Sequence, residues 1–108
     1  LRPGKEGEAP GAAAGGAAEW LRAPAVSRDG GDEVRIVLVN QSGAALSVFW
    51  VDAAGERREY GSLAAGERRE QRTFTGHVWF FTRPSGAALS FRTQGPGEVV
   101  IDAATPAL

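Results

Sequence analysis

The chain contains a single histidine, His77, which begins the aromatic segment HVWFFT. Side chains alternate between the two faces of a strand, so His77 and Trp79 share one face and the residues between and after them share the other. The same alternation puts Val48, Trp50 and Asp52 on one face of the segment LSVFWVD. If the two tryptophan faces meet, they form an aromatic wall beside the only imidazole. The alternative is that these rings are core and the histidine is a hydrogen-bonded structural residue.

Catalysis by this histidine lacks partners. The chain has no second histidine, no cysteine and no G-x-S-x-G motif, so a nucleophilic triad cannot be assembled. A dyad of His77 with Asp52 or Glu56 and with Ser62 can be posed, but nothing in the spacing selects those residues. We therefore expect no enzyme activity.

Metal and cofactor sites are equally unsupported. One histidine and no cysteine exclude thiolate zinc sites and multi-histidine metal sites. The sequence Gly95-Pro-Gly97 lacks the lysine and the following helix of a phosphate-binding loop. We expect neither a metal nor a cofactor.

The length and charge of the chain limit the classes of partner that we expect. The 108 residues suit one domain, and 12 Lys+Arg against 13 Asp+Glu give a formal charge of −1. A nucleic-acid binder usually carries a basic surplus, so we expect no nucleic-acid partner. No apolar run approaches the ~20 residues that cross a bilayer, so we expect no membrane span. The charged run at 67–72 is typical of a solvated strand face with cross-strand charge pairs.

The chain divides into an N-terminal tail and a domain. Residues 1–19 consist mainly of Gly, Ala, Pro and Glu, a composition that cannot bury enough apolar surface to offset its ordering entropy. We expect a flexible tail or linker there and a single domain over 20–108. Trp20 and Leu21 are the first pair able to pack, either across one end of the domain or in a short extended segment reaching Val26.

The domain is predicted to be all-β. Runs rich in β-branched and aromatic residues alternate with Gly, Pro, Asn and Asp turns every ~8–12 residues, which is typical of an antiparallel sandwich or barrel. No apolar stripe of helical period occurs after residue 34. Seven strands are expected, at 34–39, 46–52, 57–60, 67–74, 77–82, 88–93 and 98–101.

The stretch from Asn40 to Phe81 resembles the β-domain of the von Hippel–Lindau family without a gap. It carries an Asn-x-Ser turn, a tryptophan at Trp50 and a tyrosine at Tyr60, each ten residues after the last. A Tyr-x-x-Leu-x-x-Gly turn and a Gly-His-x-Trp-x-Phe strand follow in the same register. No single motif is specific, but their joint register is.

The resemblance implies a seven-stranded antiparallel β-sandwich that holds an extended peptide containing 4-hydroxyproline. In that scheme His77 and Thr73 would read the ligand hydroxyl, and Tyr60 would offer its ring and its backbone carbonyl. The residues that would line the pocket are Trp50, Tyr60, Thr73, Phe74, His77 and Trp79. The alternative function is a scaffold domain that keeps the same fold and binds no ligand.

The chain departs from the family pattern at four positions. Thr73 replaces a serine, Phe74 a tyrosine, Arg72 a histidine and Gly61 a proline. We expect the glycine at position 61 to loosen its loop. Members of the family continue into a helical domain that docks a ubiquitin-ligase adaptor. Residues 101–108 contain no helix-forming segment, so we expect no adaptor binding. The sequence does not indicate a cellular compartment.

Overall fold

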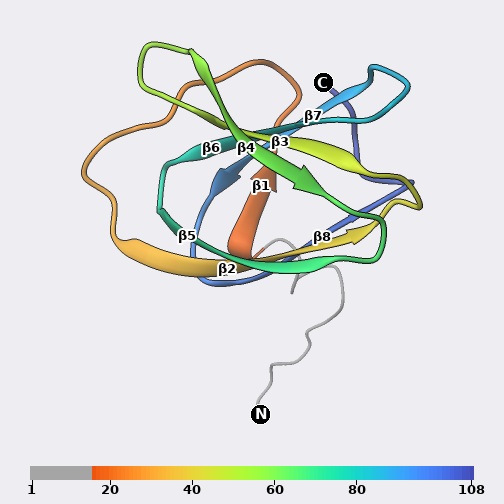
Figure 1. Ribbon diagram of the computed structural model, residues 1–108. Coiled ribbons are helices and arrows are strands. Elements are labelled where there is room, and N and C mark those ends of the chain that lie inside the picture. Colours follow the sequence, from red (N-terminus) through yellow and green to blue (C-terminus); the bar gives the residue numbers. More distant parts are fainter. Residues whose placement is uncertain (1–15) are drawn as a thin grey trace.

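The computed structural model describes residues 16–108 and shows two β-sheets packed face to face (Figure 1). One sheet has five strands in the order β1-β7-β6-β3-β4, and the other has three in the order β5-β2-β8. The strands are β1 (Ala18–Trp20), β2 (Glu33–Gln41), β3 (Leu46–Val51), β4 (Arg57–Leu63), β5 (Arg68–Phe74), β6 (Val78–Thr82), β7 (Ala88–Thr93) and β8 (Gly97–Asp102). Within these residues no helix is long and apolar enough to cross a bilayer.

The all-β sandwich prediction is confirmed, and the seven expected strands correspond to β2 through β8. Two details differ. An eighth strand, β1, pairs with β7, and β2 pairs with β8 in parallel, so the fold is not wholly antiparallel. A parallel pair needs a long connection, and here the chain runs through β3 to β7 before it returns beside β2. Strand pattern alone does not reveal the direction of such a remote partner.

The main core lies between the two sheets. Trp79 and Phe81 of β6 face it together with Val48 of β3, while Val78 and Phe80 face away. The alternation predicted for this strand is therefore confirmed. The three-stranded sheet completes this core from the opposite side; its residues in the main core are Ile36, Leu38, Val99 and Ile101.

The outer face of the five-stranded sheet is covered by the segment after β1. Leu21 and Ala25 pack there against a second cluster around Phe80. Trp20 instead packs against the main core, and the centroids of its ring and of the Phe91 ring are 5.3 Å apart. Trp20 and Leu21, which the sequence marks as the first pair able to pack, thus lie on opposite faces of the sheet. Ser27 ends this cover in a buried position between β3 and β6, accepting from the Val78 amide at 2.7 Å and donating to the Val51 carbonyl.

The packed domain begins earlier than residue 20. Ala17 and Ala18 are buried in the main core, and β1 starts at Ala18. Residues 17–19, which we placed in the tail, therefore belong to the domain, because short side chains fit close to the β7–β8 connection. The remainder of the expected tail, residues 1–15, lies outside the described residues.

Every second residue of the charged run lies on a solvated strand face, as predicted. Arg68, Glu70 and Arg72 alternate along β5 and make cross-strand ion pairs with Glu98, Arg35 and Glu33. Because these side chains are more than half exposed, each pair contributes only about 0–1 kcal/mol. The residues between them point the other way, toward the interior of the sandwich.

Asn40 joins the turns at the ends of β2 and β4. Its fully buried side-chain amide donates to the Leu63 carbonyl at 2.9 Å and to the Ala44 carbonyl at 2.8 Å. Its oxygen accepts from the Ser42 amide at 3.0 Å and from the Ser42 hydroxyl at 2.7 Å. The Asn-x-Ser motif is therefore structural, and it secures the end of the strand that carries Tyr60.

Candidate functional site

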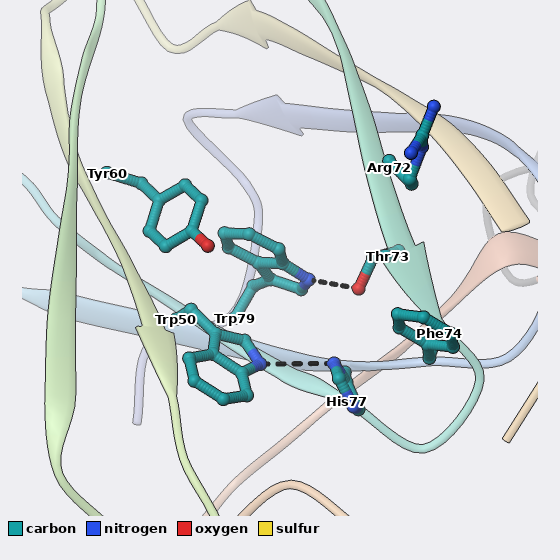
Figure 2. A pocket seen from close by; sticks show the side chains of 7 residues that line it. All are labelled: Trp50, Tyr60, Arg72, Thr73, Phe74, His77 and Trp79. Carbon is teal, nitrogen blue, oxygen red and sulfur yellow. Dashed lines mark hydrogen bonds between the residues drawn. The ribbon is translucent and has the colours of Figure 1, made fainter. Parts of the chain in front are cut away.

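A cavity of about 240 Å³ opens at one side of the sandwich, between an edge strand of each sheet. β4 is the edge of the five-stranded sheet and β5 the edge of the three-stranded sheet (Figures 1 and 2). The structure brings all six residues of the predicted site together around this cavity and adds Arg72. The lining residues are Trp50, Tyr60, Arg72, Thr73, Phe74, His77 and Trp79.

The floor of the cavity is a hydrogen-bonded pair of buried residues. Trp79 and Thr73 are each 2% exposed, and the Trp79 Nε1–H donates to Thr73 Oγ1 at 2.9 Å (Figure 2). Among residues 16–108 no other polar group bonds the indole nitrogen, so this contact orients the ring. Since Thr73 accepts this bond, its own hydroxyl proton remains to be donated to another group.

The imidazole wall is formed by Trp50 and His77. Trp50 lies directly opposite Trp79 across the β3–β6 pair, and its Nε1–H donates to His77 Nδ1 at 3.1 Å (Figure 2). Only an unprotonated Nδ1 can accept this bond, so the neutral ring carries its proton on Nε2. The centroid of the Phe74 ring lies 5.2 Å from that of the imidazole, and this ring closes the wall on the β5 side.

The imidazole is neutral at physiological pH. Partial burial lowers the pKa of His77 below its ordinary value of 6.5, and the Asp29 carboxylate opposes this shift without cancelling it. The charged form would also lose its bond from Trp50. Both effects keep Nδ1 unprotonated at pH 7, where it accepts from Trp50.

The turn between β5 and β6 is held by the loop at 28–32. The Thr75 amide donates to the Asp32 carbonyl at 2.9 Å, and the Arg28 amide donates to the Gly76 carbonyl at 3.0 Å. Gly31 permits this approach, because a Cβ at that position would lie 1.9 Å from the Thr75 carbonyl oxygen. The close contact places Phe74 and His77, which flank the turn, at the cavity.

A β-bulge aims Tyr60 at the cavity. Ser62 and Glu59 oppose Ser47 and Phe49, so β4 has one residue more than β3 in this interval. In a regular strand Tyr60 would point away from the core that Leu63 enters, three residues later. The extra residue reverses this, and the Tyr60 ring meets Trp79 edge-on with centroids 5.1 Å apart.

Gly61 makes the bulge possible with a φ of +84°. Proline, whose φ is held near −65°, cannot adopt this conformation. The replacement of the family proline is thus more than a loosening of the loop, because the bulge requires a residue free to take positive φ.

The rim of the cavity is exposed, whereas its floor is closed. Tyr60 is 47% exposed and Phe74 38%, although both are large apolar side chains. Arg72 extends away from the rings (Figure 2) and forms an ion pair with Glu33, with 2.8 Å between its Nε and the carboxylate. Arg72 was not among the residues predicted to line the cavity, because strand alternation puts the residue directly before Thr73 on the opposite face.

The residues posed as partners in a dyad lie elsewhere. Asp52 closes the β3–β4 turn, where it accepts from the backbone amide of Glu56 at 2.8 Å and from that of Ala54 at 2.9 Å. These bonds and the contact with Arg58 hold the pKa of Asp52 below its ordinary value. Neither Asp52, Glu56 nor Ser62 lines the cavity. Residues 16–108 also contain no cluster of three metal-ligating side chains.

Comparison with known proteins identifies the domain. No curated protein sequence matches the chain significantly. A family model described as VHL beta domain matches residues 25–91, which is more than half of the chain and includes every residue that lines the cavity. The chain therefore belongs to the VHL beta domain family.

Proposed function

We propose that this domain binds an extended peptide and recognises a 4-hydroxyproline side chain in the cavity between β4 and β5. The observation that carries the proposal is the convergence of six residues on one open cavity. These are the residues to which the family resemblance assigns hydroxyproline recognition. Family membership supports protein–protein interaction in general, and the cavity chemistry supports this particular ligand.

The aromatic walls suit a pyrrolidine ring. Trp50, Tyr60 and Trp79 bring their rings together at the cavity, opposite Thr73 and Phe74 (Figure 2). A pyrrolidine ring has flat C–H surfaces that pack well on such rings, and burial of this apolar surface contributes at roughly 25 cal/mol per Å². The exposed rim formed by Tyr60 and Phe74 leaves the ring a route of entry.

The two polar groups suit a hydroxyl. The Thr73 hydroxyl has a proton to donate because its oxygen already accepts from Trp79. His77 Nδ1 accepts from Trp50, and a ligand hydroxyl can donate to it in place of the indole. Plain proline would leave the buried Thr73 hydroxyl proton without a ligand partner, at a cost of about 1–3 kcal/mol, whereas His77 would keep its bond from Trp50.

The neighbouring strand edges suit the peptide main chain. β4 and β5 are both edge strands, and edge strands carry backbone groups that another extended segment can pair with. The exposed side chains of β4 leave its outer edge accessible over most of its length. Side-chain recognition in the cavity then fixes the register of the peptide.

Calorimetric titration of two peptides that differ only in the 4-hydroxyl tests the proposal. Because 1.4 kcal/mol corresponds to a factor of ten, we expect a preference of about tenfold or more for the hydroxylated peptide. Equal affinity for the two peptides would refute hydroxyl recognition. Absence of binding to both would refute the proposed function as a whole.

A scaffold domain without a ligand is the second candidate. It is favoured by the floor of the cavity, where Thr73 and Trp79 satisfy each other and are almost fully buried. His77→Ala separates the candidates. In a binding domain this variant loses affinity for the hydroxylated peptide, whereas in a scaffold it lowers only the free energy of unfolding.

A further inference from the structure

We infer that Arg69 is a positioning residue that holds the Tyr60 wall of the cavity in place from the opposite sheet. The effect on ligand affinity rests on the proposed function, whereas the effect on the wall itself does not. Arg69 belongs to the charged run at 67–72, which the sequence predicts to be solvated. Its position two and four residues before Gln71 and Thr73 puts it on the inward face of β5, and this period was the signal that it differs from its neighbours.

The guanidinium spans the open side of the sandwich. Arg69 opposes Leu38, a core residue of β2, and its side chain is only 25% exposed. Nη1 donates to the Tyr60 carbonyl at 3.2 Å, and Nη2 donates to the Ser62 carbonyl. These two carbonyls lie on either side of Gly61, so one guanidinium bridges the bulge that aims the tyrosine.

This contact is the direct polar link between the two walls. β4 and β5 belong to different sheets, so no ladder of backbone hydrogen bonds holds them at a set distance. Within residues 16–108, no other hydrogen bond joins β5 to β4. The width of the cavity between Tyr60 and Thr73 therefore depends on Arg69 and on the packing of Tyr60 against Trp79, in addition to the bonds that join the two sheets at Thr73 and at Asn40.

Glu67 orients the guanidinium. Its carboxylate lies 3.6 Å from Arg69 Nε, and its other oxygen accepts from the Ala64 amide at 2.7 Å. The carboxylate is thus anchored to the turn that connects β4 to β5. A lysine could supply the charge at position 69 but not the planar fork that reaches two carbonyls at once.

Arg69→Met and Arg69→Lys test the inference, with Arg68→Met as the matched control. Arg68 is the neighbouring residue on β5, but it faces outward and pairs with Glu98. In the ligand-free protein, we expect the nuclear Overhauser contacts between the Tyr60 and Trp79 rings to weaken in both Arg69 variants and to persist in Arg68→Met. In calorimetry, we expect both Arg69 variants to bind the hydroxylated peptide at least tenfold more weakly than Arg68→Met does.

Two outcomes overturn the inference. One is an Arg69→Met protein with ring contacts like those of the wild type and an affinity within twofold. The other is tighter binding, which would mean that Arg69 competes with the peptide for the β4 carbonyls. If Arg69→Met does not fold, Arg69→Lys decides by the same criteria. If the wild-type protein binds neither peptide, the proposed function fails, and the ring contacts alone decide the role of Arg69.

Discussion

At the scale of single residues, the cavity depends on hydroxyl and imidazole groups that each have one bond within the protein and one bonding capacity left. Thr73 accepts from Trp79 and keeps a proton to donate. The bond to the indole also makes Thr73 structural, because the buried Nε1–H has no other partner in the part of the chain that the structure describes. Under the proposed function, ligand recognition and stability are therefore coupled at this residue.

Thr73→Val tests this coupling with a substitution of nearly equal shape. Because the Trp79 indole N–H would lose its acceptor in a buried site, we expect the free energy of unfolding to fall by about 1–3 kcal/mol. The preference for hydroxylated over plain peptide should also be lost. Urea unfolding and paired titrations measure the two effects.

Thr93→Val is the matched control for that variant. Thr93 is also buried on a strand, but its hydroxyl oxygen finds no hydrogen-bond partner within residues 16–108. Replacing an unpaired hydroxyl by a methyl should leave stability unchanged or raise it slightly. A loss of stability equal to that of Thr73→Val would show that the bond to Trp79 contributes nothing.

The single histidine gives the domain a pH dependence that can be assigned. Burial lowers the pKa of His77 below 6.5, and its unfolded form keeps the ordinary value. Between these two pKa values the unfolded state binds more protons, so the free energy of unfolding falls as the pH drops below 6.5. Affinity for the hydroxylated peptide should be constant between pH 7 and 8 and should fall as the pH drops through the lowered pKa.

His77→Gln checks this assignment. No other side chain in the sequence ordinarily titrates between pH 6 and 8, so the variant should lose the step in the stability curve. Chemical unfolding at a series of pH values measures it. A step that persists in His77→Gln would assign the proton to another group.

At the scale of the element, β4 shows how one added residue redirects a side chain. The bulge at Tyr60 and Gly61 turns an exposed edge strand into one wall of the cavity. A β-bulge also twists an edge away from regular pairing, which discourages aggregation through the free strand. The same local feature therefore serves the site and protects the edge.

Gly61→Ala tests the role of the bulge. An L-residue at a φ of +84° costs roughly 1–2 kcal/mol, and nothing lies within 4 Å of the added Cβ, so the penalty is one of backbone conformation. We expect a loss of stability of that size and, because the strand relieves the strain by shifting, weaker binding of the hydroxylated peptide.

Gly86→Ala provides the comparison, since Gly86 has a φ of +94° and equally open surroundings in the β6–β7 turn. It should show a similar loss of stability with unchanged peptide affinity. If both variants retain wild-type affinity, the bulge does not determine the position of Tyr60. Thermal unfolding and calorimetry on the two proteins are sufficient.

At the scale of the whole molecule, the two sheets have unequal numbers of strands and do not close into a barrel. The edge strands β4 and β5 remain apart (Figure 1). The cavity occupies the opening between them. The far face of the larger sheet is covered by residues 21–28 rather than by a third sheet. Ser27 secures this cover next to the strand ends that carry Trp50 and His77.

Ser27→Ala should therefore destabilise the whole domain. The buried Val78 amide would lose its acceptor, at a cost of about 1–3 kcal/mol. Ser85→Ala is the control, because Ser85 lies in an exposed turn and its change should alter stability by less than about 0.5 kcal/mol. Equal urea midpoints for the two variants would contradict a stabilising role for Ser27.

Much of this architecture was predictable from local sequence. The alternation of apolar residues predicted the seven strands β2 through β8 and the shared face of His77 and Trp79. The joint register of the family motifs predicted which six residues surround one cavity. Both signals succeed because strand alternation has a short, regular period and because turn residues mark its limits.

Four features escaped prediction because each depends on a partner far along the chain. They are the short strand β1, the parallel pairing of β2 with β8, the bulge at Gly61 and the inward reach of Arg69. Ala18 reads as part of a low-complexity tail until β7 lies beside it, and Arg69 reads as solvated until β4 lies across the opening.

The sequence by itself determined the strands, their buried faces and the chemical groups available to a ligand, since these follow from backbone periodicity and residue type. Only the tertiary structure decided that Tyr60 faces inward, that Thr73 and His77 each hold an indole, and that an arginine bridges two sheets. Those arrangements are set by the packing of strands remote in sequence, where one inserted residue reverses a face. No local pattern records that choice.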